Sequence, residues 1–239
     1  MVNTLNLWRR PLGEVPGEVW ERTDLEVLIL AETGLKALPP EIGRLKRLVT
    51  LDLGHNELTT VPDELGGLTA LSGCLYLHDN RLRELPGTLG GLKGLRYLNV
   101  GENELTALPE SLGGMASLIE LRAQHNRLTT LPAGLGELSR LRELWLRGNA
   151  IEHLPPSVAG LRELRHLDLR DNRLAELPEP LAGLPLLRQV DLRSNRLTGL
   201  PGWVTRMPAL EKLDLRWNPC DPDPSVLAEL EQAGCVVLI

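Results

Sequence analysis

Leucines recur along the chain in a fixed order of hydrophobic and polar positions. The stretch from Leu164 to Pro178 reads L-R-H-L-D-L-R-D-N-R-L-A-E-L-P, and the sequence on both sides repeats this arrangement. An asparagine marks each repeat, at positions 56, 80, 103, 126, 149, 172, 195 and 218, with an interval of 23 residues after a first step of 24. A period in the twenties predicts a solenoid, in which each turn of the chain stacks on the one before.

Each repeat contains an L-x-L pair, which predicts a short strand. Side chains alternate between the two faces of an extended segment, so Leu167 and Leu169 are expected inside while His166, Asp168 and Arg170 point outward. The asparagine that follows is expected to be buried and to bond backbone groups of its own turn and of the next repeat. The Leu-Pro pair then ends regular pairing, because proline has no N–H, and the chain returns along an extended or short helical path.

The columns L-x-x-L-x-L-x-x-N-x-L and L-P-x-x-[LIV]-x-x-[LM] resemble the leucine-rich repeat over nearly the whole chain. The resemblance implies an α/β fold class, a leucine-rich repeat solenoid: a right-handed superhelix with a curved parallel sheet on the concave face and short helical or extended convex segments. It also implies a non-catalytic scaffold for a protein partner. The 23-residue L-P-x-x-[IL]-G-x-L units are similar to those of intracellular and bacterial members, some of which bind small GTPases or phosphatases. No motif selects among those partners.

The repeats predict a single domain over residues 1–239, with a degenerate N-terminal cap and first turns at 1–47, regular repeats at 48–218 and a C-terminal capping helix and strand at 219–239. Arg10 and Thr33 stand where later repeats have asparagine, so the asparagine ladder is expected to begin at Asn56. Terminal repeats are usually atypical in this way. Trp8 and Trp20 are expected to cover the exposed end of the core.

The C-terminal cap is predicted from capping residues and from counting. Asp223 is a good N-cap with Pro224 in the first helical position, and an apolar stripe runs to Gly234, a natural helix stop. The residues from 235 to 239 are then predicted to form a final strand. Counting on by the repeat interval puts Val236 and Leu238 in the inward columns.

Two irregularities interrupt the columns. The segment from Leu71 to Leu75 has three residues between leucines where the other repeats have two, which predicts a bulge, and Gly73 is expected to supply the backbone freedom. A harmless insertion is favoured over a functional one. Ala123 replaces a leucine of the inward columns, which predicts a local void or inward repacking.

Charge restricts the class of partner, and cysteine content indicates the cellular location. A formal net charge of −6 and a pI near 5.5 argue against nucleic acid and anionic membrane. We find no apolar run of the roughly 20 residues that span a membrane, and no signal-peptide pattern at the start of the chain. Three cysteines are an odd number, and the capping clusters typical of extracellular members are missing, so the expected location is cytoplasmic. Cys220 is expected to be a small buried core residue, and a Cys220–Cys235 bridge is a disfavoured alternative.

Residue types that carry chemistry fit structural positions instead. The pairs Gly90-Gly91 and Gly113-Gly114 recur at the repeat interval, and no G-x-x-x-x-G-K-[ST] phosphate loop occurs, so these are turn glycines. A metal cluster of His55, His78 and Asp79 is an alternative because adjacent strands lie about 4.8 Å apart, but no H-x-x-x-H or C-x-x-C spacing supports it. We expect no catalysis and no cofactor.

The outward columns hold the information about binding. The middle outward position is acidic near the C-terminus, and the next position is Arg147, Arg170, Arg193 and Arg216, which we interpret as a self-compensated, solvated face. The centre differs, because Tyr76, Tyr97, Arg122 and Trp145 gather there with His78 and Asn99. Five of the seven aromatic residues of the chain stand at or near outward sheet positions: Trp8, Tyr76, Tyr97, Trp145 and Trp217. Tyr, Trp and Arg dominate binding hot spots. The predicted partner-binding residues of the concave face are Tyr76, His78, Tyr97, Asn99, Arg122, Trp145, His166 and Arg170.

These residues support three functional hypotheses. The first is a protein-interaction scaffold, expected to be a monomer, that grips a protein partner of unknown identity in its concave face. The second is recognition of a small molecule, glycan or metal by the central Tyr, Trp and His residues. The third is nucleic-acid binding through the arginine column, which the net acidity disfavours.

Overall fold

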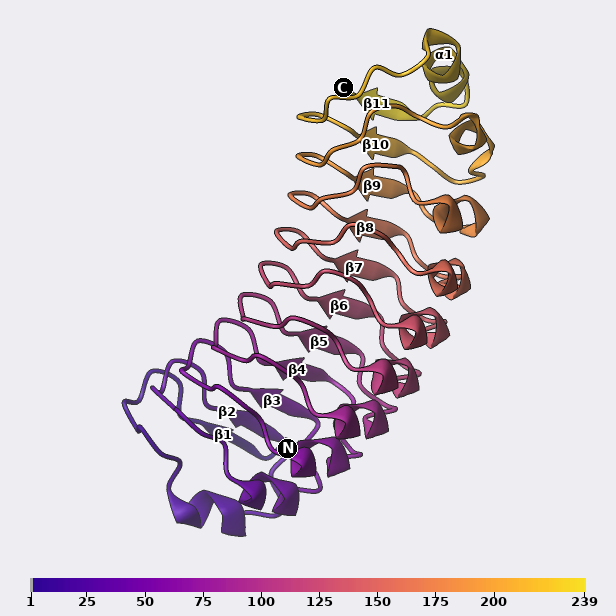
Figure 1. The fold of residues 1–239 in the computed structure, drawn as a ribbon. Coiled ribbons are helices and arrows are strands. Elements are labelled where there is room, and N and C mark those ends of the chain that lie inside the picture. Colours follow the sequence, from indigo (N-terminus) through magenta and orange to yellow (C-terminus); the bar gives the residue numbers. More distant parts are fainter. Residues whose placement is uncertain (1) are drawn as a thin grey trace.

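The computed structural model describes residues 2–239, and in this part of the chain eleven strands form one parallel sheet in sequence order. Figure 1 shows the strands stacked along an arc, with short helices running along the opposite side of the stack. The strands are β1 (Thr4–Asn6), β2 (Val27–Ile29), β3 (Thr50–Asp52), β4 (Cys74–Tyr76), β5 (Tyr97–Asn99), β6 (Glu120–Arg122), β7 (Glu143–Trp145), β8 (His166–Asp168), β9 (Gln189–Asp191), β10 (Lys212–Asp214) and β11 (Val236–Leu238).

The return path of each repeat contains one turn of 3-10 helix that begins just after the Leu-Pro or Val-Pro pair. Proline at this point supplies an extended backbone and no N–H to bond, so the chain leaves the sheet and turns back. These helices are η1 (Gly17–Glu21), η2 (Pro40–Arg44), η3 (Asp63–Gly67), η4 (Gly87–Gly91), η5 (Glu110–Gly114), η6 (Ala133–Glu137), η7 (Pro156–Gly160), η8 (Glu179–Gly183) and η9 (Gly202–Arg206).

The leucine columns form one continuous core between the sheet and the 3-10 helices. The central residue of each strand pairs with the central residue of the next, as Leu98, Leu121 and Leu144 do in β5 to β7. Leu98 and Leu121 are fully buried. The alternation of faces predicted from L-x-L is therefore confirmed, and the flanking residues of each strand face the concave side.

The asparagine ladder satisfies the buried turns. Asn172 Nδ2 donates to the carbonyl of Leu169 in its own turn, at 3.0 Å, and to that of Leu146, at 3.1 Å. Its Oδ1 accepts from the N–H of Ile151, at 3.0 Å. Leu146 and Ile151 belong to the preceding repeat, so the prediction of bonds to the next repeat was wrong in direction. The physical reason is that the side chain leaves the turn toward the edge that the earlier strand already occupies.

Thr33 extends this ladder by one repeat toward the N-terminus. Its N–H donates to Asn56 Oδ1 at 3.1 Å, and its hydroxyl donates to the carbonyl of Leu30 at 2.7 Å. A threonine hydroxyl has one donor where an asparagine amide has two, and it replaces the bond within the turn. The tryptophans of this end differ from each other. Trp20 is buried in the core, whereas Trp8 is 51% exposed, so only Trp20 covers the end as predicted.

The residue before each ladder position has a left-handed backbone conformation. Nine of these residues in the described chain are not glycine, among them Ser194 at φ 53° and Trp217 at φ 64°, while Gly148 has φ 68°. Left-handed backbone costs an ordinary residue about 1–2 kcal/mol. Each repeat therefore carries a small strain at the turn that follows its strand.

This strain predicts opposite effects for two substitutions. Gly148→Ala is expected to destabilise the fold by about 1–2 kcal/mol, because the alanine must adopt positive φ. Its Cβ would also lie 2.5 Å from the His125 ring. Ser194→Gly is expected to stabilise it by about 0.5 kcal/mol, because relief of strain exceeds the added entropy of the unfolded glycine. Urea unfolding of both variants measures the difference, and equal shifts of the same sign would contradict it.

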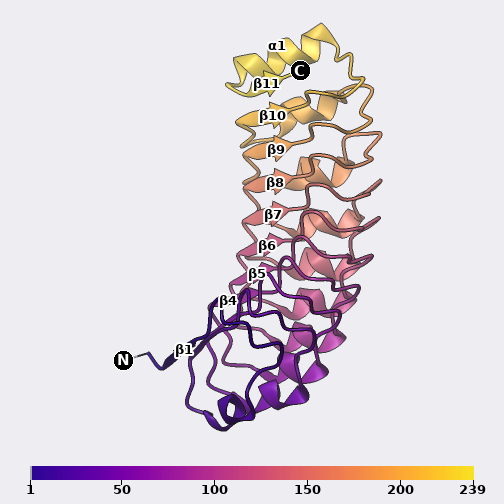
Figure 2. The same ribbon diagram turned by 90° about the vertical axis from the view of Figure 1, so that its left-hand side faces the viewer.

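The C-terminal cap is a helix followed by a strand. Helix α1 (Pro224–Gln232) begins where Asp223 accepts a hydrogen bond from the N–H of Ser225, at 2.8 Å. Figure 2 shows α1 lying across the end of the stack beside β11. Leu230 of the helix is 2% exposed and belongs to the core.

The predicted register of this last strand was wrong by one residue. Val237 pairs with Leu213, so Val237 takes the inward column, and Val236 is 55% exposed. The reason is that α1 replaces the 3-10 turn and makes the last step one residue longer than the repeat. Side chains alternate with period two, so a slip of one residue exchanges the faces.

The cysteines are all free, and only Cys235 is fully buried. Cys220 is half-buried and packs against the edge of the core, so it is less enclosed than predicted. Burial raises the pKa of both the Cys220 and the Cys235 thiols. Among the helices of residues 2–239, none is both long and apolar enough to cross a membrane.

The insertion before β4 is accommodated as a local mismatch with β3. Leu75 pairs with Leu51 and Tyr76 with Asp52, while the first residue of β4 has no partner in the register. Gly73 does not need a left-handed conformation, as its φ lies outside that region. A Cβ at this position would lie 2.6 Å from Thr50 Oγ1, so the glycine is required for close approach to the neighbouring strand rather than for backbone freedom. Ala123, the other irregular residue, is fully buried.

Candidate functional site

The centre of the concave face carries a row of rings and cations that crosses five strands, from β4 to β8. The Tyr76 and Tyr97 ring centroids lie 5.1 Å apart. The guanidinium of Arg122 lies 5.8 Å from the Tyr97 ring centre and 5.3 Å from that of Trp145, so it bridges the two rings. Trp145 in turn packs against His166, at 4.3 Å between centroids. We call these five side chains, which are all among the predicted site residues, the aromatic row.

Adjacent acidic groups orient the aromatic row. Arg122 Nε donates to Glu120 Oε1 at 2.6 Å, and the Trp145 indole N–H donates to Glu143 Oε2 at 3.2 Å. Burial lowers the pKa of the Arg122 guanidinium, but the Glu120 bond and neighbouring charges outweigh it and leave that pKa raised. Burial raises the pKa of the Tyr97 phenol. The row therefore presents a fixed cation between rings and a neutral phenol at neutral pH.

His78 continues the row toward the N-terminus. Its ring packs edge-on against Tyr76, at 5.9 Å, and against His55, at 4.7 Å. It lies flat across Gly54, where an added Cβ would be 2.5 Å from the ring. Burial, with the charge of His55, lowers the pKa of His78 and favours the neutral imidazole. His78 Nδ1 is buried and has no hydrogen-bond partner among the described residues.

Two of the predicted site residues are less available than expected. Asn99 lies within the patch but is only 7% exposed, and its Oδ1 accepts from the N–H of Gly101 at 3.0 Å. The side chain of Arg170 is largely buried beside Asp171, with Nε 3.3 Å from Asp171 Oδ2. His55 was not among the predicted site residues. The sequence does carry a signal for it, since a glycine at 54 leaves room for the neighbouring histidine to lie against it.

The C-terminal half of the concave face is largely self-compensated, as predicted. Arg193 forms two-pronged bonds with Asp191, at 2.9 and 2.5 Å, and Arg216 does the same with Asp214, at 3.0 and 2.7 Å. Burial acts to raise the pKa of Asp214, but the bonds from Arg216 outweigh it and hold that pKa below its usual value. These two carboxylates are therefore paired within the protein.

Asp168, the third carboxylate of that column, is an exception. It is 8% exposed, and no lysine or arginine nitrogen of residues 2–239 forms an ion pair with it. Its Oδ1 accepts one backbone bond, from the N–H of Arg170 at 3.0 Å. Burial, together with the negative charge of Asp191, raises the pKa of Asp168 to about 6.

Asp168 lines a hollow beside the aromatic row. The hollow has a volume of about 260 Å³. It lies between the outward side chains of β6 to β8 and the left-handed turns that follow β5 and β6. Its lining residues are Glu102, Arg122, Gln124, His125, Trp145, Arg147 and Asp168.

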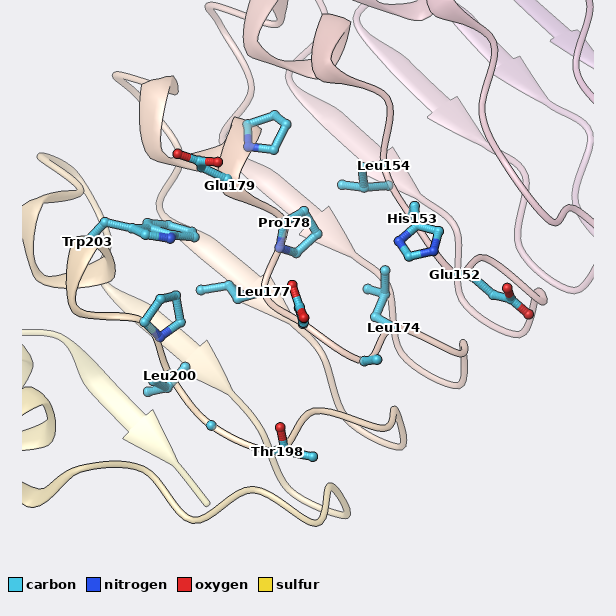
Figure 3. Close-up of a pocket in the computed structure, with 15 residues that line it drawn as sticks. Glu152, His153, Leu154, Leu174, Leu177, Pro178, Glu179, Thr198, Leu200 and Trp203 are labelled. Carbon is cyan, nitrogen blue, oxygen red and sulfur yellow. The ribbon is translucent and has the colours of Figure 1, made fainter.

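A second, larger groove lies away from the concave face, between the return paths of the last regular repeats. It has a volume of about 570 Å³, and Figure 3 shows Trp203, Leu177 and Leu200 along one part of it, with Glu152 and His153 at the other end. Its walls contain prolines and leucines. The groove therefore combines an apolar floor with an acidic rim.

Glycine positions explain why this groove opens where it does. A Cβ at Gly160 would lie 2.3 Å from the carbonyl of Gly136, so the turns up to η7 are in close contact. At Gly183, the equivalent position in η8, the nearest atom to such a Cβ is Ala159 Cβ, at 4.0 Å. The convex turns thus separate after η7.

The described residues contain no group of three or more His, Cys, Asp or Glu arranged to hold a metal ion. His55 Nδ1 lies 2.5 Å from Asp79 Oδ2, so these two side chains hydrogen-bond to each other at the surface. The concave face is a broad surface on which aromatic and charged side chains pack against one another.

An open parallel solenoid with a 23-residue asparagine-marked repeat defines a class of binding scaffold. The chain belongs to the leucine-rich repeat family: models described as "Leucine rich repeat" match residues 23–73 and 74–128, and one described as "Leucine-rich repeat region" matches residues 131–233. Domains of this family generally act by binding proteins and not by catalysis.

Solved structures with the same fold include plant receptors. The ectodomain of the Arabidopsis thaliana membrane receptor kinase GASSHO1/SCHENGEN3, in complex with CASPARIAN STRIP INTEGRITY FACTOR 2, shares 28% identity over 99% of this chain and 29% of its own, with a TM-score of 0.81. The plant peptide hormone receptor RGFR1, in complex with RGF2, shares 28% identity over 95% of this chain and 46% of its own, with a TM-score of 0.69. The chain thus spans less than half the length of either receptor chain.

Proposed function

We propose that the protein binds a protein partner through the centre of its concave face, with the aromatic row as the main contact. The observation that carries this proposal is the continuous packing from Tyr76 to His166 across five strands. Surface aromatics need a reason in a chain with only 3% aromatic residues and no phenylalanine. The two receptors above, each described in complex with a partner, support binding by such a domain in general.

Rigidity supports the choice of this surface. Rings and an arginine that are already packed and hydrogen-bonded lose little side-chain entropy when a partner covers them. Tyr, Trp and Arg are also the residue types that carry most of the energy in protein interfaces. The aromatic row therefore has both the composition and the preorganisation of a hot spot.

A small molecule or glycan is a weaker candidate for this face. Pockets for drug-sized ligands usually enclose about 300–1,000 Å³. The concave hollow has about 260 Å³ and is open on the side of the sheet. A protein segment that covers the row and inserts one side chain suits this shape better.

Substitution of the row tests the proposal. Tyr97→Ala, Arg122→Ala and Trp145→Ala are each expected to weaken binding of the partner by about 1–4 kcal/mol, the range for truncation of an anchor residue. Folding is expected to change little, since these side chains lie outside the leucine core. Affinity capture from a cell extract supplies the partner, and calorimetric titration with thermal melts measures both properties.

The control variant lies on the flank of the solenoid. Glu84→Ala is suitable because Glu84 is exposed and forms no ion pair in the described chain. Glu110 is unsuitable, since its carboxylate accepts from the N–H of Gly134 at 3.0 Å and ties two repeats together. Full affinity in all three row variants would reject the site. Loss of affinity in Glu176→Ala and Glu179→Ala instead would assign binding to the groove of Figure 3.

The proposed setting is a monomer in the cytoplasm. The free thiols of Cys74 and Cys220 and the buried thiol of Cys235 support a reducing compartment. Light scattering of the purified protein tests the monomer, and localisation of the tagged protein in its own cells tests the compartment.

A further inference from the structure

We propose that the hollow beside the aromatic row is a subsite for a primary ammonium group, a lysine side chain of the bound partner, held by the carboxylate of Asp168. This inference rests on the proposed function in one respect, that a partner docks on the concave face. The residues that line the hollow support the subsite on their own, and a small probe tests it without a partner.

Asp168 differs in its partners from the two carboxylates beside it in the same column. Asp191 and Asp214 each receive two bonds from the arginine two residues further on. Arg170, in the equivalent position, contributes only its backbone N–H to Asp168, and its side chain lies against Asp171. A carboxylate that is 8% exposed and has no cation partner in the described chain is costly unless a ligand supplies one.

The hollow is lined by both arginines and carboxylates. Arg122 pairs with Glu120 at 2.6 Å, and Arg147 shares the carboxylate of Asp171 with Arg170, at 3.3 Å from each. Glu102, at the edge of the hollow, forms no ion pair within residues 2–239. Both arginines of the hollow thus contact a carboxylate, whereas Asp168 and Glu102 form no ion pair in the described chain, and these two carboxylates favour a cation.

The hollow also contains hydrogen-bond acceptors that suit an ammonium group. Gln124 Oε1 is buried, lines the hollow and has no donor among the described residues. The Gln124 side chain lies against Gly101, where an added Cβ would be 2.5 Å from the Gln124 amide nitrogen. The lack of a side chain at Gly101 therefore leaves room for Gln124 in this position. Asp168, Glu102 and Gln124 Oε1 are acceptors, and an ammonium has three donors and no acceptor. The Trp145 ring forms an apolar wall for the methylene stem of a lysine.

The geometry also predicts proton linkage. Binding a cation favours ionised Asp168 and lowers its pKa from about 6, so protons are released on binding near that pH. Affinity is then retained above pH 6 and falls as the pH drops below it. The charged and titratable groups that face Asp168 are Asp191, which opposes ionisation, and His166, Arg147 and Arg193, which favour it.

The test uses Nα-acetyl-lysine methylamide as the probe and the intact protein. The indole N–H resonance of Trp145, assigned with Trp145→Phe, is followed by NMR during titration at pH 7.5 and pH 5. We expect a saturable shift with a Kd in the millimolar range at the higher pH, and at least tenfold weaker binding at the lower pH. The neutral analogue Nα-acetyl-norleucine methylamide is expected to cause no saturable shift.

Asp168→Asn is the decisive variant. Asn99 occupies the same column and makes the same Oδ1 bond to the backbone two residues on, so asparagine at 168 is expected to fold. It should weaken probe binding at least tenfold, whereas Asp63→Asn, on η3, should leave it unchanged. A flat titration with wild-type protein, equal binding by Asp168→Asn, or equal binding of the norleucine analogue would each overturn the subsite.

The two proposals fail in different ways. Probe binding that depends on Asp168, with full partner affinity in the aromatic-row variants, would keep the subsite and reject the concave docking surface. Loss of partner affinity in those variants, with no probe binding, would keep the docking surface and reject the subsite. Stronger binding of Nα-acetyl-arginine methylamide than of the lysine probe would replace the ammonium by a guanidinium and overturn the assignment of lysine.

Discussion

Removal of residues 224–239 is expected to turn the folded protein into an aggregating chain. This segment contains α1 and β11, which cover the last repeat. Leu230 of α1 is 2% exposed and Cys235 is 3% exposed, so both lie in the core. The backbone of β10 pairs with β11 through the N–H of Leu215 and the carbonyl of Leu238, at 2.7 Å. Truncation exposes the leucine core and an unpaired strand edge together.

Point substitutions separate the cap from the mere length of the chain. Val237→Asp is expected to mimic the truncation, because Val237 takes the inward column opposite Leu213. Val236→Asp should be tolerated, since Val236 is 55% exposed. Size-exclusion chromatography with light scattering and a thermal melt measure both effects. A soluble truncated monomer with an unchanged melting temperature would contradict this role of the cap.

Val236 and Val237 show how far the sequence predicts the fold. Within the regular repeats, an L-x-L pair followed by asparagine determines which side chains face inward, because a strand alternates faces and each repeat has the same length. At the cap a helix replaces the 3-10 turn, and the count of residues per turn changes. Periodicity alone could therefore predict the helix and a final strand, but not the register of Val236 and Val237.

The arrangement of the concave face could likewise be predicted only in part from the sequence. The columns of the sequence were sufficient to bring Arg122 beside Trp145, since neighbouring strands place equivalent residues side by side. Tyr97 stands two residues earlier in its strand, opposite Glu120, and its ring lies near Arg122 diagonally across the sheet.

The columns did not distinguish Asp168 from Asp191, since both are followed by leucine and arginine, and the columns do not show that Asp171, which stands where the next repeat has Ser194, competes for Arg170. The difference arises from the side-chain direction of the arginine, which depends on contacts with the adjacent turn.

The second of the largest effects is expected from the asparagine ladder. Asn172→Ala removes a side chain that is 8% exposed and that bonds the backbone of two repeats. The N–H of Ile151 loses its partner, whereas the carbonyls of Leu146 and Leu169 keep a bond from the amides of Asn149 and Asn195, at 2.8 and 3.0 Å. An unpaired buried group costs about 1–3 kcal/mol, so we expect a loss of about 1–3 kcal/mol in the free energy of unfolding.

Arg173→Ala is the matched control, because Arg173 is adjacent and exposed, and its one ion pair, with Glu152, spans 4.0 Å. A surface pair of this kind contributes at most about 1 kcal/mol. Asn149→Ala should fall between the two variants, since Asn149 is only half-buried, although it makes equivalent bonds to Leu146 and Leu128. Denaturant unfolding of the three variants orders them. Equal shifts for Asn172→Ala and Arg173→Ala would show that packing of the leucines, and not the buried amide, holds adjacent repeats together.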